Sequence, residues 1–205
     1  MRPWIQAIFF LLFLRPFFLL FIGLRMRGRE HLPERDPFIL IANHTSHLDA
    51  ASILTLFPLA RLCRIRPVAA KDYFLRNAVV AWLSRTLFNI LPIARKGITK
   101  EDNPVEEMRR ALDRGESLIL FPEGTRGAGP EPAPFHAGVA HLLERAPGVP
   151  VVPAYLLNLG RSLPKGEFLP VPFFAEVRLG PPLHPSGSRE EVLNQLQTAV
   201  MDLRS

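Results

Sequence analysis

The chain has 205 residues, which suggests one domain with a sizeable core and a short appendage. Its 25 Lys and Arg against 19 Asp and Glu give a formal net charge of +6, which favours anionic partners such as phosphate groups, acidic lipid surfaces or an acidic carrier protein. The single cysteine, Cys63, excludes an internal disulfide and a cysteine-rich zinc site, and the scattered basic residues argue against a nucleic-acid partner.

The most apolar stretch covers residues 4–24. Its Leu, Ile and Phe side chains favour the membrane by roughly 6 kcal/mol, whereas Arg15 costs about 2.5–3.5 kcal/mol if it is held at the bilayer centre. Arg15 and Pro16 divide the stretch into halves that are each shorter than the roughly 20 residues of a span, and Pro16 is expected to kink a helix. We favour a re-entrant pair of short helices or an interfacial anchor over a tilted, kinked span. A buried core hairpin is the alternative without a membrane.

Three arginines, Arg25, Arg27 and Arg29, follow where a secretory signal would have a small-residue cleavage site. Basic residues beside an apolar segment also favour the cytoplasmic side and acidic headgroups. We therefore expect residues 1–29 to form an N-terminal membrane-associating segment. Residues 30–205 then form a single α/β domain at the cytoplasmic face of the inner (plasma) membrane.

The first polar motif lies between an apolar run at residues 39–42, which is typical of a buried strand, and an apolar stretch from residue 50 that suits the start of a helix. In one regular helix, His44 and Asp49 would be about 140° apart, at roughly 100° per residue. They meet only if His44 lies on a turn and Asp49 lies in the first helical turn. A strand-to-helix turn of this kind exposes side chains at the ligand-binding edge of an α/β sheet. A histidine held by a carboxylate is suited to act as a general base.

The same residues also fit a simpler role. Ser46 and Asp49 match the [ST]-x-x-[DE] capping pattern in front of an apolar run. Under this interpretation Asp49 serves the helix N-terminus and His44 is an ordinary loop histidine, and Asp49 can also do both. His47 is interpreted as a packing or surface residue.

The rest of the chain alternates strands and helices, which indicates an α/β layered fold with a mixed, mostly parallel sheet flanked by helices. Asn103 and Pro104 mark a helix start, and Gly115 marks its end. We expect further strands at residues 67–71, 117–121, 151–157 and 173–179, and a strand or extended segment at residues 87–94. Helices are expected at residues 73–83, 104–114, 135–145 and 189–203.

A second polar motif follows the strand expected at residues 117–121. Gly124 gives the backbone freedom to turn tightly beside a ligand, and Arg126 offers a planar, always charged group that suits a phosphate. Here the sequence resembles the glycerolipid acyltransferases typified by 1-acyl-sn-glycerol-3-phosphate (lysophosphatidate) acyltransferase. NHTSHLD at residues 43–49 matches the first motif of that family and FPEGTR at residues 121–126 matches the third. LFNILPIARKG and VPVVP resemble the second and fourth, so the resemblance spans residues 37–157.

This resemblance implies transfer of a fatty acyl group from acyl-CoA or acyl carrier protein to the free hydroxyl of 1-acyl-glycerol-3-phosphate, giving phosphatidic acid in phospholipid biosynthesis. It implies His44 as the general base and Asp49 as its partner, with no acyl-enzyme, no cofactor and no metal. The substrate-binding residues that it implies include cations for the acceptor phosphate and a carboxylate for an acceptor hydroxyl. They are Arg95, Lys96, Glu123, Gly124, Thr125 and Arg126.

Some alternatives remain. A salt bridge from Arg126 to Glu123 or Asp49 is the structural alternative to phosphate binding. His136 stands where many family members have a lysine, so a cationic contribution from that position at neutral pH is not expected. The rival functions are a metal-dependent hydrolase that uses His44, His47 and Asp49, a lipid-binding membrane protein without activity, and an acyltransferase for another lysolipid or glycerol 3-phosphate.

Overall fold

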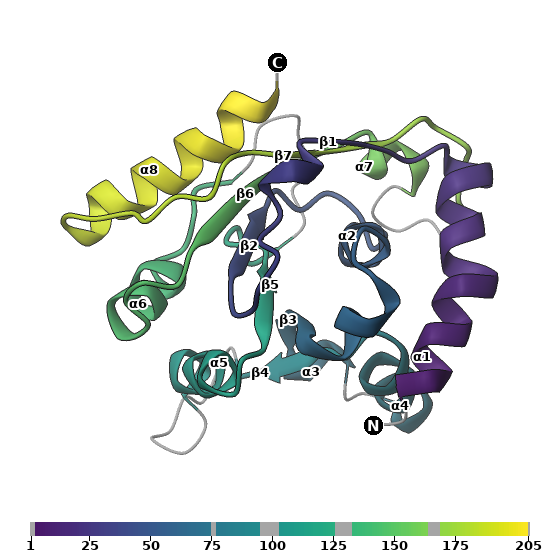
Figure 1. Cartoon of the computed structure of the whole chain (residues 1–205), viewed down its shortest axis with the longest axis horizontal. Helices are drawn as coiled ribbons and strands as arrows, with labels where there is room; N and C mark the ends of the chain where they lie inside the picture. The colour runs from purple at the N-terminus through teal and green to yellow at the C-terminus, as the bar shows by residue number, and fades with distance from the viewer. Residues whose placement is uncertain (1–2, 75–76, 95–102, 126–132, 164–168, 205) are drawn as a thin grey trace.

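The computed structural model describes residues 3–74, 77–94, 103–125, 133–163 and 169–204. Seven strands form one sheet in the order β1-β7-β6-β2-β5-β3-β4, and every neighbouring pair is parallel except β6 and β7 (Figure 1). The mixed, mostly parallel sheet with flanking helices confirms the predicted fold class. The strands are β1 (Arg25–Arg27), β2 (Ile39–Ala42), β3 (Ile65–Ala70), β4 (Leu91–Ile93), β5 (Ser117–Leu120), β6 (Val151–Leu157) and β7 (Glu176–Leu179).

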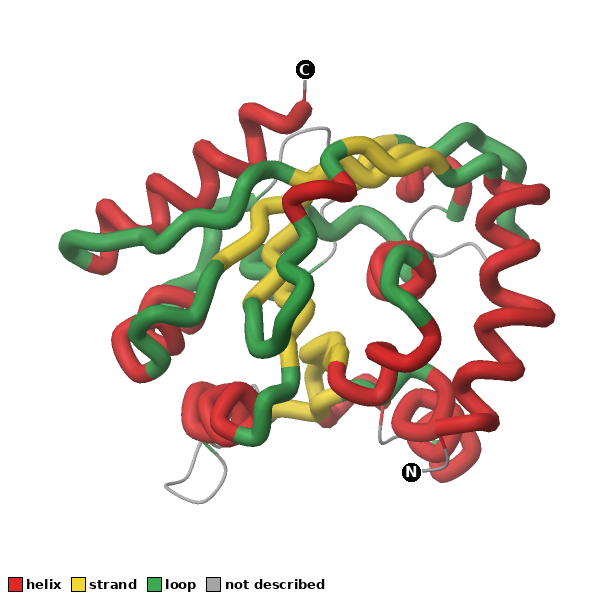
Figure 2. Tube along the Cα trace, viewed as in Figure 1, coloured by secondary structure: helices red, strands yellow, loops and turns green. Residues whose placement is uncertain are grey.

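Helices cover both faces of this sheet (Figure 2). They are α1 (Pro3–Phe9), α2 (Asp49–Thr55), α3 (Lys71–Phe74), α4 (Ala78–Leu87), α5 (Pro104–Asp113), α6 (Gly138–Arg145), α7 (Leu159–Ser162) and α8 (Arg189–Met201), with π-helical turns η1 (Phe10–Leu14) and η2 (Phe17–Ile22) and 3-10 turns η3 (Arg29–His31), η4 (Leu59–Arg64) and η5 (Asp202–Arg204).

The central strands β2 and β5 are buried along their whole length, and apart from Ser117 their sequences are apolar, as is typical of such strands. Successive side chains of a strand point to opposite faces, so Leu40 packs into the core that also contains residues of α2 and the N-terminal helix, whereas Ile39 packs into the core beneath α5, α6 and α8. β2 and β5 are parallel and in register. Their carboxyl ends therefore meet at one edge of the sheet, where both polar motifs begin.

The structure corrects one expected helix and the expected start of the α/β domain. The helix expected at residues 73–83 is two helices, because the Asn77 side chain accepts a hydrogen bond from the backbone N–H of Val79 and starts α4 anew. The sheet also begins before residue 30, since β1 pairs with β7. The α/β domain therefore extends at least to Arg25, and Arg25 and Arg27, which were expected in the membrane-associating segment, lie on a strand with exposed side chains.

The N-terminal segment forms one continuous helix, Pro3–Ile22, of 20 residues, and an 18-residue window of it has a mean hydropathy of 2.3. Its length and composition are sufficient to cross a membrane. The expected break at Arg15 and Pro16 does not occur, because π-helical turns lie on both sides of Pro16 and accommodate its missing N–H. A re-entrant pair of short helices is therefore wrong for this chain.

This helix lies against the domain. The Gln6 side chain donates to the Leu87 carbonyl over 3.0 Å, and Arg15 Nη2 donates to the Phe57 carbonyl over 2.6 Å. Phe10 and Phe18 are buried in the core between the helix and the sheet. Arg15 therefore faces the protein, where a backbone carbonyl stabilises its charge, and the opposite face of the helix is exposed.

Candidate active site

The turn that leaves β2 is fixed to β6 by the Asn43 side chain. Asn43 Nδ2 donates to the Leu156 carbonyl over 3.1 Å, and Asn43 Oδ1 accepts from the Leu156 backbone N–H over 2.6 Å. Asn43 is only 2% exposed, so these bonds satisfy a buried amide that would otherwise be costly. The backbone at the start of the turn is therefore held in one position at the sheet edge.

His44 and Asp49 meet as the turn geometry predicts. His44 lies on the turn, Asp49 is the first residue of α2, and His44 Nδ1 is 2.8 Å from Asp49 Oδ2. The same Oδ2 accepts from the backbone N–H groups of Thr45 and Ser46 over 2.6 and 2.9 Å. Because a carboxylate only accepts, Nδ1 carries the shared proton and Nε2 is left as a bare acceptor. The imidazole also stacks on Phe121, with ring centroids 4.3 Å apart.

The capping role of Asp49 is present in modified form. Leu48 is the N-cap of α2 and no side chain caps this helix, but Asp49 reaches back to two backbone N–H groups of the preceding turn. One buried carboxylate thus shapes the turn and orients His44. His47 is exposed, and among the described residues no group of three or more His, Cys, Asp or Glu side chains could hold a metal ion.

Glu123 braces the two motifs against each other. Glu123 Oε1 accepts from the His44 backbone N–H over 2.9 Å, and Oε2 accepts from the Ala133 backbone N–H over 3.2 Å. The side chain is 2% exposed. Burial raises the pKa of Glu123, and its hydrogen bonds with the two backbone N–H groups lower it in part. Glu123 does not line the cavity, and its expected hydrogen bond with an acceptor hydroxyl stays a prediction.

Gly124 follows in the left-handed region, with a φ of +68°. A Cβ at this position would lie 2.8 Å from Cδ2 of His136, whose ring packs against the glycine. The His136 backbone N–H donates to the Pro122 carbonyl over 2.9 Å, which holds the backbone of His136 beside this turn. The tight turn and the close contact explain why glycine is required here.

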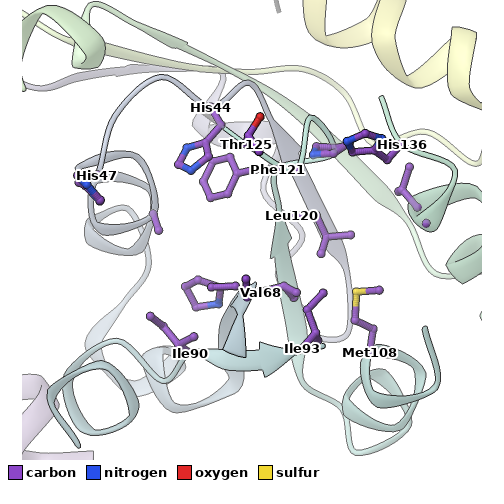
Figure 3. A pocket seen from close by; sticks show the side chains of 18 residues that line it. His44, His47, Val68, Ile90, Ile93, Met108, Leu120, Phe121, Thr125 and His136 are labelled. Atoms are coloured by element: carbon purple, nitrogen blue, oxygen red, sulfur yellow. The ribbon is translucent and has the colours of Figure 1, made fainter. Parts of the chain in front are cut away.

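A cavity of about 430 Å³ opens beside these residues, within the range of about 300–1,000 Å³ that is usual for small-molecule sites. Figure 3 shows His44, Phe121 and Thr125 at one end, and Val68, Ile90, Ile93 and Met108 at the other. The cavity therefore runs from the histidine into an apolar interior. Its remaining lining residues are His47, Ala50, Pro67, Ala69, Ala70, Leu120, Pro122, Gly124, His136, Gly138 and Val139.

A family model described as Acyltransferase matches residues 23–157, which include both motifs and six of the seven strands. The chain belongs to the acyltransferase family. Three of its relatives are 1-acyl-sn-glycerol-3-phosphate acyltransferases: BAT2 from the chloroplast of Brassica napus, 28% identical over 69% of this chain and 39% of its own; the alpha enzyme of Mus musculus, 28% identical over 93% and 65%; and a protein of Chlamydomonas reinhardtii, 34% identical over 68% and 40%. The chain thus spans 39 to 65% of the length of these relatives.

The fold has a counterpart in the crystal structure of the 1-acyl-sn-glycerophosphate (LPA) acyltransferase PlsC from Thermotoga maritima. The two chains are 23% identical, with a TM-score of 0.74 over 99% of this chain and 80% of that one. The acyltransferase fold therefore extends over the whole chain, including its N-terminal helix and the C-terminal helix α8.

Three of the acyltransferase residues predicted from the sequence, Arg95, Lys96 and Arg126, lie outside the described residues. The others are placed: His44, Gly124 and Thr125 line the cavity, and Asp49 and Glu123 lie behind it. The bracing role of Glu123 had no sequence signal, because its partner His44 is 79 positions away along the chain.

Replacing Glu123 by glutamine tests the brace. One oxygen becomes an NH₂ group that faces a backbone donor, so the His44 backbone or the loop at Ala133 loses its partner. We expect kcat to fall by roughly tenfold, because a misplaced His44 raises the activation free energy by about 1.4 kcal/mol. The acceptor KM should change little. Steady-state kinetics measure both values. The control is Glu144→Gln, since Glu144 is an exposed residue of α6 that pairs with Arg189. A rise in the acceptor KM alone would contradict the brace and would support a hydrogen bond between Glu123 and the acceptor hydroxyl.

Proposed function

We propose that this protein transfers a fatty acyl group from an acyl thioester, acyl-CoA or acyl carrier protein, to the free hydroxyl of 1-acyl-glycerol-3-phosphate, giving phosphatidic acid for phospholipid biosynthesis. The observation that carries the proposal is the His44–Asp49 pair at the mouth of a cavity with apolar walls. The relatives named as 1-acyl-sn-glycerol-3-phosphate acyltransferases support the choice of acceptor.

In the proposed reaction, His44 Nε2 takes the proton of the acceptor hydroxyl as its oxygen attacks the thioester carbonyl. Asp49 stabilises the imidazolium that forms, because its buried carboxylate already accepts the Nδ1 proton. The tetrahedral intermediate collapses to the ester and expels the thiolate, which takes the proton back from His44. Transfer is direct, so neither an acyl-enzyme nor a cofactor is required.

The developing oxyanion and the acceptor phosphate need donors. The backbone N–H groups of Thr45, Ser46 and Gly124 are already donated within the turns. Thr125 is exposed and lines the cavity together with His44 (Figure 3), and its hydroxyl is the donor that we propose contacts the substrate. Arg95 and Arg126, with Lys96 as a third cation, are proposed to bind the phosphate, since guanidinium groups match its geometry and the chain has a net charge of +6.

The apolar walls of the cavity are proposed to hold the acyl chain, so filling them should shorten the preferred chain. Val68 lies on β3 at the end of the cavity away from His44 (Figure 3). For Val68→Phe we expect kcat/KM for a sixteen-carbon donor to fall by roughly tenfold relative to an eight-carbon donor, because one or two buried methylenes are worth about 1–3 kcal/mol. Competition between the two donors measures the ratio. An unchanged ratio would place the acyl chain elsewhere.

The exposed face of the N-terminal helix is proposed to lie in the membrane interface on the cytoplasmic side. Gln6 and Arg15 tether this helix to the domain along its length, which suits a helix in the plane of the interface better than an independent span. The acceptor and the product are both membrane lipids. The anchored domain would then meet its acceptor at the membrane surface.

Acyl transfer by the purified protein in detergent tests the proposed function. Acyl-CoA and acyl carrier protein are offered separately against lysophosphatidate, other lysophospholipids and glycerol 3-phosphate. Turnover on lysophosphatidate that disappears in the His44→Ala variant is the expected result. Reaction only with a different acceptor would correct the substrate, and retention of lipid without any turnover would support a lipid-binding protein without activity.

A further inference from the structure

The exposed large hydrophobic side chains of the described residues are confined to three segments. Eight of them lie on the N-terminal helix, three lie on α4, and Leu169, Val171, Phe173 and Phe174 lie between α7 and β7. Figure 1 shows α4 at one end of this helix and the stretch before β7 at the other. Phe174 lies at the helix end, because a Cβ on Gly23 would be 2.6 Å from its ring. We call residues 169–174 the apolar loop.

The backbone of the apolar loop is held while its side chains are exposed. The Val171 N–H donates to the Ser162 carbonyl over 2.8 Å, and the buried Ser162 hydroxyl donates to the Phe173 carbonyl over 3.0 Å. Asn158 Nδ2 donates to the Phe174 carbonyl over 3.1 Å. Phe173 and Phe174 are nonetheless 43% and 74% exposed. A fixed backbone that presents two phenyl rings to solvent leaves a large apolar surface without a partner.

An arginine guanidinium lies over each of these two rings. The Arg161 guanidinium lies 5.6 Å from the Phe173 ring centroid, and the Arg25 guanidinium lies 5.9 Å from that of Phe174. Both arginines are exposed. Exposed aromatic rings with arginines beside them suit the boundary between acyl chains and anionic headgroups. Building on the proposed interfacial helix, we propose that the apolar loop is a second membrane contact, with Phe173 and Phe174 inserted and Arg25 and Arg161 bound to lipid phosphates.

Through this contact the apolar loop would also set the position of the catalytic turn relative to the membrane surface. The Ser46 hydroxyl donates to the Leu163 carbonyl over 3.0 Å, so the turn that carries His44 is joined to the segment leading into the apolar loop. Thr45 packs against Gly160 of α7, where a Cβ would lie 3.1 Å from Thr45 Cβ. The loop therefore orients the cavity mouth toward lipids in the bilayer, and losing it should affect membrane-borne acceptors selectively.

Vesicle flotation of the full chain tests the contact. Vesicles of phosphatidylglycerol and phosphatidylcholine are compared with vesicles of phosphatidylcholine alone. For Phe173→Ser/Phe174→Ser we expect about tenfold weaker binding to both. For Arg25→Gln/Arg161→Gln we expect loss of the preference for the anionic vesicles. Normal binding by both double variants would overturn the proposal, whereas Leu12→Ser/Leu20→Ser on the exposed helix face tests the helix separately.

Two further readouts separate this contact from other effects. In a Trp4→Phe/Trp82→Phe background, a Phe174→Trp variant has a single tryptophan, and brominated lipids should quench its fluorescence. Unquenched fluorescence would overturn insertion even if the serine variants misfold. In acyl transfer, the loop variant should have a raised apparent KM for lysophosphatidate in vesicles and unchanged kinetics with a short-chain, water-soluble acceptor. Failure of the wild-type protein to acylate either acceptor would refute the proposed function, while the binding measurements would still decide the membrane contact.

Discussion

His44→Ala is expected to lower kcat by about 10²–10⁴-fold, the usual contribution of a positioned general base. The variant removes the imidazole whose Nδ1 is held by the Asp49 carboxylate, and with it the proposed base Nε2. The fold should survive, because the His44 side chain is partly exposed and the backbone N–H that Glu123 binds is unchanged. Turnover under saturating donor and acceptor measures the effect, and thermal unfolding checks that the variant is folded.

Two histidine variants make this result specific. His141→Ala on α6, which faces Glu144 at 3.7 Å and does not line the cavity, controls for the loss of a surface histidine. His47→Ala separates the base mechanism from the metal-dependent hydrolase, because the latter requires His47 as much as His44. Near-normal activity of His44→Ala would refute the base assignment. Equal losses in His44→Ala and His47→Ala would point to a shared ligand set.

The parts of the fold that the sequence predicted correctly are those in which short-range pattern and tertiary environment agree. The central strands β2, β5 and β6 are apolar runs between polar turns, and their predicted positions match the structure closely. The meeting of His44 and Asp49 also followed from local geometry, since only a turn followed by a helix start lets side chains five positions apart touch. Local information was sufficient in both cases.

The parts that were missed depend on contacts between distant segments. β1 consists of Arg25–Arg27 and has no apolar pattern, and it is a strand because β7 supplies a parallel partner. The helix runs past Pro16 because π-helical turns on either side of it accommodate the missing N–H, while Arg15 before the proline and the buried Phe18 after it hold the helix to the domain. Glu123 was assigned to substrate because no pattern links it to the backbone of His44.

Asp49→Asn is expected to lower kcat by about 10- to 100-fold while keeping the fold. Only Oδ2 of Asp49 accepts hydrogen bonds from the described residues, from His44 Nδ1 and the Thr45 and Ser46 N–H groups, and Oδ1 is buried with no such partner. An asparagine can place its carbonyl oxygen at the Oδ2 position and its NH₂ group on the other side. The histidine tautomer is then preserved and only the negative charge is lost, which weakens a charge-assisted bond by about 1.5–3 kcal/mol at most.

Asp49→Ala provides the contrast, because it removes the charge and the acceptor together. It leaves two buried backbone donors and the His44 Nδ1–H without a partner, at about 1–3 kcal/mol for each unsatisfied buried group. We therefore expect a loss of unfolding free energy of about 3 kcal/mol and activity as low as that of His44→Ala. Denaturant unfolding and kcat, measured on both variants, separate the two roles of this carboxylate. If Asp49→Asn retained full activity, Asp49 would serve the turn alone and the imidazolium would need another source of stabilisation.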